Sequence, residues 1–392
     1  MKPPSSRLSC PSVDINGYAG RDLVTNPVYL DHNATTPVKP DVIEAMAEAM
    51  AIGGNPSSVH AQGRAARQMV FRAREQVAAL VGVSPEAIVF TSGGTEANNQ
   101  ALAGGQRPVL ASAIEHPSVL AVSDHQQPAP VDGDGMLDLT SLARLLEGQR
   151  PATLAVMMAN NETGVIQPVK EAAAIAHEAG VRLHVDAVQA AGKIPVDFFE
   201  LGADTLSLSA HKMGGPQGVG ALIFRPGVEP LPLLQGGSQE QRFRAGTENV
   251  PGIVGFGAAA ALALEDDGYA ERVGALRDRL EAEILALAPD AKIVGGGASR
   301  LANTTCLVLP GLGHDTQLIH FDLAGIAVSA GSACSSGKVA VSPVLAAMGL
   351  PVDEASCAIR ISFGWNSRDS DVERFLDACR RLLARRQRRE SA

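Results

Sequence analysis

Short apolar runs alternate with amphipathic stretches along the first two thirds of the chain. The apolar runs are bounded by turn-forming residues, which predicts buried strands. We expect these strands over Ile88–Thr91, Val109–Ser112, Leu154–Ala159, Arg182–Val185, Thr205–Leu208 and Gly220–Phe224. Between them, apolar residues recur at helical spacing, which predicts helices over Pro40–Met50, Gly63–Val81, Thr95–Gly104, Leu139–Glu147 and Val169–Ala179. This alternation indicates an α/β fold in which helices cover a mostly parallel sheet.

The pattern changes after a long charged helix that we expect from Tyr269 to Leu287. Beyond Pro289 the order becomes strand, loop, helix, strand, helix, which indicates a second and smaller α+β domain. We therefore expect an irregular leader over residues 1–27, a large domain over 28–275 and a small domain over 276–392. Whether residues near the N-terminus contribute to the small domain is left open by the pattern.

Composition and charge exclude several classes of protein. With 45% hydrophobic and 19% charged residues the chain is folded rather than disordered. Its net charge of −9 disfavours nucleic acid as a partner, because binding phosphates needs a basic surface. The longest uncharged apolar run, Gly252 to Leu264, has 13 residues, whereas a membrane-spanning helix needs about 20. We expect neither a nucleic-acid partner nor a membrane partner.

The five cysteines indicate a reducing compartment. Their number is odd and no two have CxxC spacing, which argues against a disulfide framework and against a zinc site. The N-terminus also lacks the apolar segment of a secretory signal. We therefore expect a cytoplasmic protein. Cys306 and Cys357 lie in apolar surroundings and are expected to be buried, whereas Cys334 has polar and glycine neighbours.

Polar residues follow the ends of four predicted strands. They are Gly93-Gly94-Thr95, Asn160-Asn161-Glu162, Asp186 with Gln189, and Ser209-Ala210-His211-Lys212. Each group has a plain explanation by itself, such as a turn or a helix cap. Together they offer a glycine turn that can bind an anion, an acid and a lysine. This combination predicts a pyridoxal phosphate site, in which the lysine binds the cofactor and the acid pairs with its ring nitrogen.

These residues lie in longer motifs that resemble the cysteine desulfurases, which are fold-type-I pyridoxal phosphate enzymes of the class-V aminotransferase family. The motifs are Leu30–Pro37, Thr91–Glu96, Glu115–His116, Asn160–Gly164, His184–Gln189, Ser209–Lys212, Arg244–Thr247 and Ser329–Cys334. They follow one another in one order over about residues 28 to 380. The resemblance implies a large domain with a mostly parallel central sheet and a smaller α+β domain.

The resemblance also implies roles for the residues that hold the cofactor. Lys212 would form the Schiff base and move the Cα proton, and His116 would stack on the ring and take part in proton transfer. Asp186 would pair with the ring nitrogen and Gln189 with the phenolic oxygen. The remaining cofactor contacts would come from Gly94, Thr95, Asn161, Ser209 and His211, and from Thr247 of the second subunit of a homodimer. His184, inside a strand, is expected to be structural.

For the substrate, the resemblance implies L-cysteine. Asn161 and Arg360 would bind its carboxylate, the arginine through a bidentate fork, and Asn33 would also contact the substrate. The thiolate of Cys334 would attack the substrate sulfur, which leaves a persulfide on the enzyme and releases L-alanine. The persulfide would pass to an acceptor in iron–sulfur cluster assembly or thiolation. The stretch Ser335–Pro343 departs from the usual Glu-Pro-Ser pattern of the family, so the acceptor stays open.

Three alternatives remain at the level of sequence. A fold-type-I aminotransferase would share Asp186 and Lys212 but would not need Cys334. A selenocysteine lyase would differ only in its substrate. A phosphate-binding module that uses the Gly93-Gly94-Thr95 turn would not bind the cofactor through a Schiff base.

Overall fold

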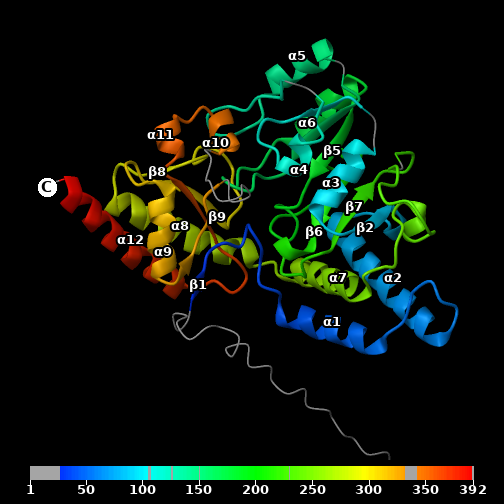
Figure 1. Ribbon diagram of the computed structural model, residues 1–392. Coiled ribbons are helices and arrows are strands. Elements are labelled where there is room, and N and C mark those ends of the chain that lie inside the picture. The colour runs from blue at the N-terminus through cyan, green and yellow to red at the C-terminus, as the bar shows by residue number, and fades with distance from the viewer. Residues whose placement is uncertain are drawn as a thin grey trace, which may run out of the picture.

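Figure 1 shows the protein as a computed structural model, with two groups of elements side by side. The structure describes residues 27–104, 107–124, 127–149, 151–228, 230–331 and 342–390. Cyan and green elements and the blue helices build the part that contains the central sheet, whereas yellow, orange and red elements build the smaller part together with a short blue strand. No helix in the described ranges is long and apolar enough to cross a membrane.

A six-stranded sheet forms the centre of the larger part. Its strands are β2 (Ile88–Thr91), β3 (Val109–Ala111), β4 (Thr153–Met157), β5 (Arg182–Asp186), β6 (Thr205–Ser209) and β7 (Gly220–Phe224), in the order β2-β7-β6-β5-β4-β3. Neighbours from β3 to β6 are parallel, whereas β7 is antiparallel to both β2 and β6. All residues of these strands except Arg182 are buried, which explains why strands such as β2 and β7 read as nearly continuous apolar runs.

Helices cover the two faces of this sheet. They are α1 (Pro40–Ile52), α2 (Ala61–Val81), α3 (Gly94–Ala103), α4 (Pro117–Leu120), α5 (Leu139–Gln149), α6 (Val169–Glu178) and α7 (Val250–Glu265), with the short 3-10 turns η2 (Pro85–Ala87), η3 (Ala210–Lys212) and η4 (Glu240–Arg242). Helix α7 packs against α1 and α2. A Cβ on Gly257 would lie 2.6 Å from the Cα of Ala73, so the close contact between α7 and α2 requires glycine there.

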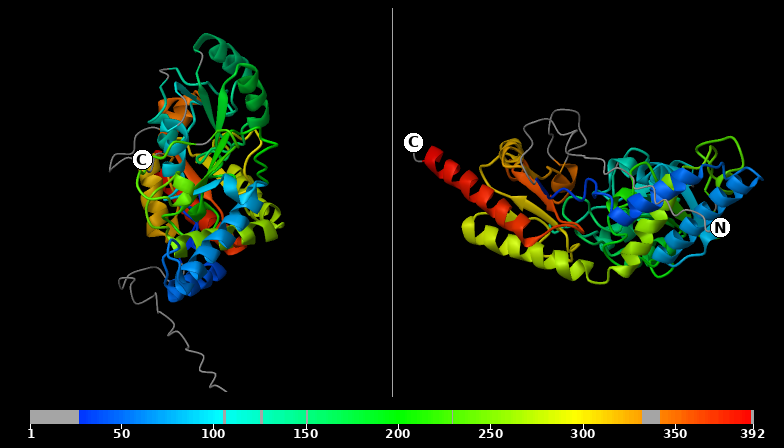
Figure 2. Two further views of the ribbon diagram at one scale, coloured as in Figure 1. Left: turned by 90° about the vertical axis from the view of Figure 1, so that its right-hand side faces the viewer. Right: turned by 90° about the horizontal axis from the view of Figure 1, so that it is seen from below.

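The smaller part is built on a three-stranded antiparallel sheet. Its strands are β8 (Lys292–Ile293), β9 (Thr304–Val308) and β11 (Ala358–Ser362), and its helices are α8 (Tyr269–Leu287), α9 (His314–Leu323), α10 (Pro343–Ala347), α11 (Val352–Ala355) and α12 (Asp369–Glu390). Helices α8 and α12 run side by side in Figure 2. The strand β1 (Val28–Tyr29) pairs in parallel with β10 (Ile326–Ala327), and Val28 and Leu30 join the apolar core of this part.

The predicted fold class is confirmed. All six predicted strands and the predicted helices are present, with boundaries that differ by no more than two residues. The short strands β1, β8 and β10 have no detectable pattern of their own, because two residues are too few to show alternation.

Candidate active site

The parallel strands end at one edge of the central sheet, and the polar residues that follow them meet there. Asp186 is the last residue of β5, Ser209 is the last residue of β6, and Gly94 opens α3 directly after β2. A Cβ on Gly94 would lie 2.7 Å from Cγ2 of Val188 and 3.6 Å from Cβ of Ser209. Glycine therefore lets the N-terminus of α3 approach the ends of β5 and β6, which creates an anion-binding position at this edge.

Lys212 lies on η3, immediately after β6. Its Nζ donates hydrogen bonds to the carbonyl oxygens of Asn33 (2.6 Å) and Ala34 (2.8 Å). These carbonyls belong to the loop between β1 and α1, so two segments far apart in the sequence fix the position of the amine. The lysine is half-buried and remains accessible to a ligand at the edge of the sheet.

Asp186 is held by a chain of buried polar groups. Its Oδ2 accepts a hydrogen bond from Nδ2 of Asn98 (2.7 Å), and its Oδ1 accepts one from the Val188 amide (2.9 Å). The Oδ1 of Asn98 contacts Nε2 of His184 at 3.0 Å, and Nδ1 of His184 contacts the Thr205 hydroxyl at 2.9 Å. Because burial lowers the pKa of His184 to about 3, the ring is neutral and donates from Nε2. His184 is thus a structural support for Asp186, as the sequence predicts.

His116 caps the N-terminus of α4 and is half-buried at the same edge. Its Nδ1 accepts a hydrogen bond from the Ser118 amide at 3.1 Å, which leaves the ring proton on Nε2. The pKa of His116 is lowered mainly by burial; Lys212 lowers it further, whereas Asp186 raises it. The charges of Lys212 and Asp186 therefore both lie close enough to His116 to change its pKa.

Asn33 connects the two parts of the molecule. Its Nδ2 donates to the carbonyl oxygen of Asn161 (3.2 Å) and to Oγ1 of Thr304 (2.9 Å). Its own carbonyl oxygen accepts from Lys212 and from Nε2 of Gln189 (3.0 Å). Asn33 is 1% exposed, so it acts as a buried junction that holds Lys212 and Gln189 near the small sheet.

Arg360 on β11 contributes a buried guanidinium group. Its Nη1 donates to the Asn161 carbonyl oxygen (3.1 Å), and its Nη2 pairs with Oδ1 of Asp31 (2.7 Å). Among the described residues its Nε is buried and has no hydrogen-bond partner. An unpaired buried donor is costly, so this nitrogen fits a site that a carboxylate ligand completes.

The predicted phosphate contacts differ in exposure. Ser209 is buried, Thr95 is exposed, and His211 is half-buried with Nδ1 3.1 Å from Oγ1 of Thr35. Burial, followed by the nearby charge of Lys212, lowers the pKa of His211 to about 4. Thr247 lies on an exposed loop after η4, as a residue presented to a second subunit would.

Cys334 lies outside the described residues. The neighbouring Ser342, where the chain is described again, donates from its hydroxyl to Oε2 of Glu162 at 2.6 Å. Glu162 follows β4 and is 4% exposed, and burial raises its pKa. Ser342 thus contacts the residue that follows Asn161 at this edge.

The residues at this edge fit pyridoxal phosphate. The opening of α3, with Thr95, Ser209 and His211, offers donors for the phosphate, and Asp186 offers a carboxylate for the ring nitrogen. Lys212 supplies the amine for the aldehyde carbon. The unpartnered Nε of Arg360 in addition fits the carboxylate of an amino-acid substrate.

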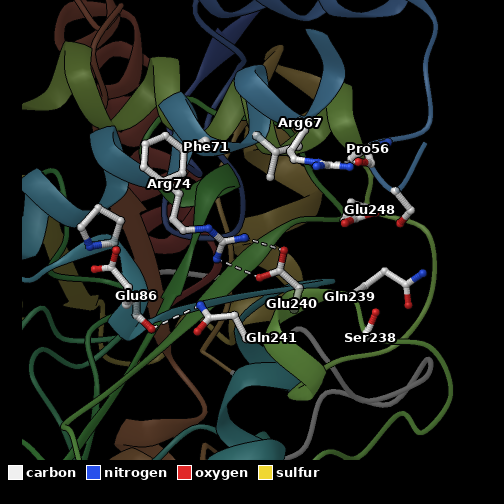
Figure 3. Close-up of a pocket in the computed structure, with 13 residues that line it drawn as sticks. Pro56, Arg67, Phe71, Arg74, Glu86, Ser238, Gln239, Glu240, Gln241 and Glu248 are labelled. Atoms are coloured by element: carbon white, nitrogen blue, oxygen red, sulfur yellow. Dashed lines mark hydrogen bonds and ion pairs between the residues drawn. The ribbon is translucent and has the colours of Figure 1, made fainter. Parts of the chain in front are cut away.

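A second hollow, of about 480 Å³, lies away from these residues and is shown in Figure 3. Arg74 crosses it and forms a bidentate ion pair with Glu240, at 2.7 and 2.9 Å. The Phe90 amide also donates to Glu240 (2.8 Å). This hollow has none of the strand-end groups that characterise the first site, but Glu248, the neighbour of Thr247, lines it.

Fold and site together define a fold-type-I pyridoxal phosphate enzyme. The sequence profile named Aminotransferase class-V matches residues 28–375, and the chain belongs to this family. Within it, the chain is 44% identical over 366 residues to a cysteine desulfurase of Cereibacter sphaeroides, which covers 89% of this chain and 94% of the relative. It is also 44% identical to the cysteine desulfurase of Gluconacetobacter diazotrophicus, which covers 92% of this chain and 94% of that protein.

Solved structures agree with this assignment. The NifS-like protein of Rickettsia africae superposes with a TM-score of 0.86 at 35% identity, covering 92% of this chain and all of that chain. The apo cysteine desulfurase of Thermococcus onnurineus superposes with a TM-score of 0.80 at 25% identity, covering 91% and 94% of the two chains. The similarity therefore extends over both parts of the molecule.

Sequence analysis missed four residues that shape the site. Asp31 pairs with Arg360, Asn98 holds Asp186, Asn303 donates to Asn33, and Lys193 contacts Gln189. The available signal was nearness to the motifs: Asp31 lies inside one, Asn98 lies two residues after one, and Lys193 lies four residues after another. Their partners come from distant parts of the chain, so their roles could not be inferred without the structure.

Proposed function

We propose that the protein removes sulfur from L-cysteine, stores it as a persulfide on Cys334 and releases L-alanine. The observation that carries this proposal is the set of complementary groups at one sheet edge: Lys212, Asp186, the opening of α3, and Arg360, whose Nε has no hydrogen-bond partner among the described residues. The comparisons support cysteine as the substrate.

In this proposal the chain holds the cofactor by its ring and its phosphate. Asp186 pairs with the ring nitrogen, Gln189 donates to the phenolic oxygen, and His116 lies against the ring. The phosphate receives hydrogen bonds from the opening of α3 and from Ser209 and the neutral His211. When bound, pyridoxal phosphate supplies an electron sink for the substrate Cα.

Arg360 and Asn161 orient the substrate through its carboxylate, with Asn33 fixing the Asn161 backbone. The amine of Lys212 then takes the proton from Cα and returns a proton later, since the carbonyls of Asn33 and Ala34 hold it in place. The thiolate of Cys334 attacks the substrate sulfur. A sulfur–sulfur bond forms, the bond from Cβ to sulfur breaks, and its electron pair stays on Cβ, which takes a proton and becomes the methyl group of alanine.

The wider setting is also part of the proposal. The persulfide passes to an acceptor protein of iron–sulfur cluster assembly or thiolation in the cytoplasm. The enzyme acts as a homodimer in which Thr247 contacts the cofactor phosphate of the second subunit. Residues 28–275 hold the cofactor and residues 276–392 carry Cys334, while β1 adds Val28 and Leu30 to the core of the second domain.

The test is release of alanine and sulfide from L-cysteine by the purified protein, with a thiol reductant present. Wild type is expected to yield both products in equal amounts. Cys334→Ala should keep cofactor and cysteine binding yet release no sulfide, and Lys212→Ala should form no alanine. Cys10→Ala serves as the matched control and should behave as wild type. Full sulfide output from Cys334→Ala would contradict the mechanism and favour a lyase.

A further inference from the structure

Lys193 is a buried lysine that the proposed mechanism does not use. It follows β5 and lies four residues after Gln189, and it is 8% exposed. Its Nζ lies 2.8 Å from Oε1 of Gln189 and 3.0 Å from Oδ1 of Asn33. Both partners are neutral amide oxygens. Burying an amine against neutral groups is costly, whereas an apolar side chain would fill the same space without that cost.

The charges around Lys193 add to this cost. Burial lowers the pKa of Lys193 well below its usual value, and the positive charges of Lys212 and Arg360 lower it further. His32 and His211 also lie within its electrostatic reach. The cost of burying this amine indicates that its hydrogen bonds have a specific role.

The hydrogen bonds of Lys193 fix the orientation of a side-chain amide. The two ends of a glutamine amide have nearly the same shape, so only their partners decide which end points where. Because Nζ of Lys193 carries donors, Oε1 of Gln189 faces it. The Nε2 of Gln189 therefore points the other way, to the Asn33 carbonyl oxygen that also accepts from Lys212.

The effect of Lys193 is specific to Gln189. Asn33 also receives a hydrogen bond from Lys193, but Nδ2 of Asn303 donates to the same oxygen at 3.1 Å. The Asn33 amide thus stays oriented when Lys193 is replaced, whereas within the described part of the chain Oε1 of Gln189 accepts its hydrogen bond from Lys193.

We propose that Lys193 is a positioning residue that holds the Gln189 amide with its N–H group toward the phenolic oxygen of the cofactor. The inference rests on the proposed role of Gln189 in binding that oxygen. Lys193 acts at a distance, through the orientation of one amide, and does not touch the cofactor itself.

A double-mutant cycle on cofactor binding tests this inference. Apo forms of wild type, Lys193→Met, Gln189→Ala and the double variant are titrated with pyridoxal phosphate, and the dissociation constants are compared. We expect Lys193→Met to weaken binding about fivefold, the effect of one neutral hydrogen bond. In the Gln189→Ala background the same replacement should have no further effect, because the amide that it orients is gone. The pH dependence of the visible cofactor absorption should shift in Lys193→Met and not shift further in the double variant.

Lys39→Met is the matched control. Lys39 lines the same small cavity as Lys193 and Lys212, so its replacement removes a neighbouring amine but does not affect Gln189. It should bind the cofactor as wild type does. If the effects of Lys193→Met and Gln189→Ala multiply, Lys193 acts independently of Gln189 and the inference is wrong. Equal binding by Lys193→Met and wild type would also overturn it.

The titrations distinguish failure of the proposed function from failure of the proposed role of Lys193. Wild type that binds no pyridoxal phosphate contradicts the proposed function, whereas normal wild-type binding with independent effects contradicts only the role of Lys193. If near-ultraviolet circular dichroism shows that Lys193→Met is unfolded, Lys193→Ala replaces it in the same cycle. Alanine also lacks a donor at this position, and coupling to Gln189→Ala again decides.

Discussion

Single side chains at this site are held by groups that come from distant parts of the sequence. Asp186 depends on Asn98 of α3, and Asn98 depends on His184 of β5. Arg360 depends on Asp31 in the same way. In each case a hydrogen bond to a neighbouring side chain fixes the orientation of the functional group.

Asn98→Ala should destabilise the protein more than the neighbouring replacement Asn99→Ala. Loss of Asn98 leaves Oδ2 of Asp186 and Nε2 of His184 without this partner, at about 1–3 kcal/mol for each buried group. Asn99 is half-buried and donates to the Ser118 carbonyl oxygen, so its loss should cost about 1 kcal/mol. Urea unfolding of the two apo variants measures the difference, and equal losses would contradict the support role of Asn98.

Arg360→Gln should raise KM for cysteine while cofactor binding stays near that of wild type. A charge-assisted hydrogen bond contributes about 1.5–3 kcal/mol, which corresponds to roughly a tenfold to hundredfold change. Arg279→Gln is a suitable control, because Arg279 forms ion pairs with Glu283 and Asp369 at the surface of the smaller part. Steady-state kinetics decide between the variants. A KM that rises equally in both would show a general loss of structure rather than a substrate contact.

At the scale of elements, sequence patterns predicted the strands and helices well because burial imposes them. A strand buried on both faces reads as a continuous apolar run, as β2 and β7 do. The contacts between these helices and strands could not be predicted from the sequence in the same way. Helix α7 approaches α2 at Gly257, and an ion pair holds η4 beside α2. Both contacts depend on tertiary packing, which leaves no periodic pattern in the sequence.

The Arg74–Glu240 pair is expected to hold η4 against α2 and β2. Replacing Arg74 with methionine leaves the Glu240 carboxylate, 3% exposed, with the Phe90 amide but without its counter-charge. The expected cost is about 3–5 kcal/mol. Lys170→Ala removes one partner of an exposed ion pair with Glu200 and should cost at most about 1 kcal/mol. Denaturant unfolding compares the two, and a small loss for Arg74→Met would show that η4 is held by other contacts.

At the scale of the whole molecule, buried ionisable groups set how stability depends on pH. Burial lowers the pKa of His32 and of His184 to about 3, so acidification below 6.5 protonates these groups in the unfolded chain first and destabilises the fold. Burial raises the pKa of Glu115 to about 8, so the folded state retains its proton between pH 4.5 and 8 and loses stability as pH rises through this window.

Glu115→Gln should remove the alkaline part of this dependence. Glutamine can still accept from Ser112 and from the Met157 amide, as the protonated acid does. Between pH 6.5 and 8 we expect the variant to lose less stability than wild type, by about 1.4 kcal/mol per pH unit. Thermal unfolding of the apo proteins over this range measures the difference. Parallel curves for the variant and wild type would mean that Glu115 is already ionised at neutral pH.

The sequence by itself determined the α/β class, the positions of the main elements and the identity of Lys212, Asp186 and Arg360 as candidate site residues. It could do so because burial and strand-end chemistry are local properties that leave a local pattern. Tertiary structure alone decided which groups hold them: Asp31 for Arg360, Asn98 for Asp186, and Lys193 for Gln189. A hydrogen bond between residues far apart in the chain depends on where two folded surfaces meet, and no period or spacing along the chain records that meeting.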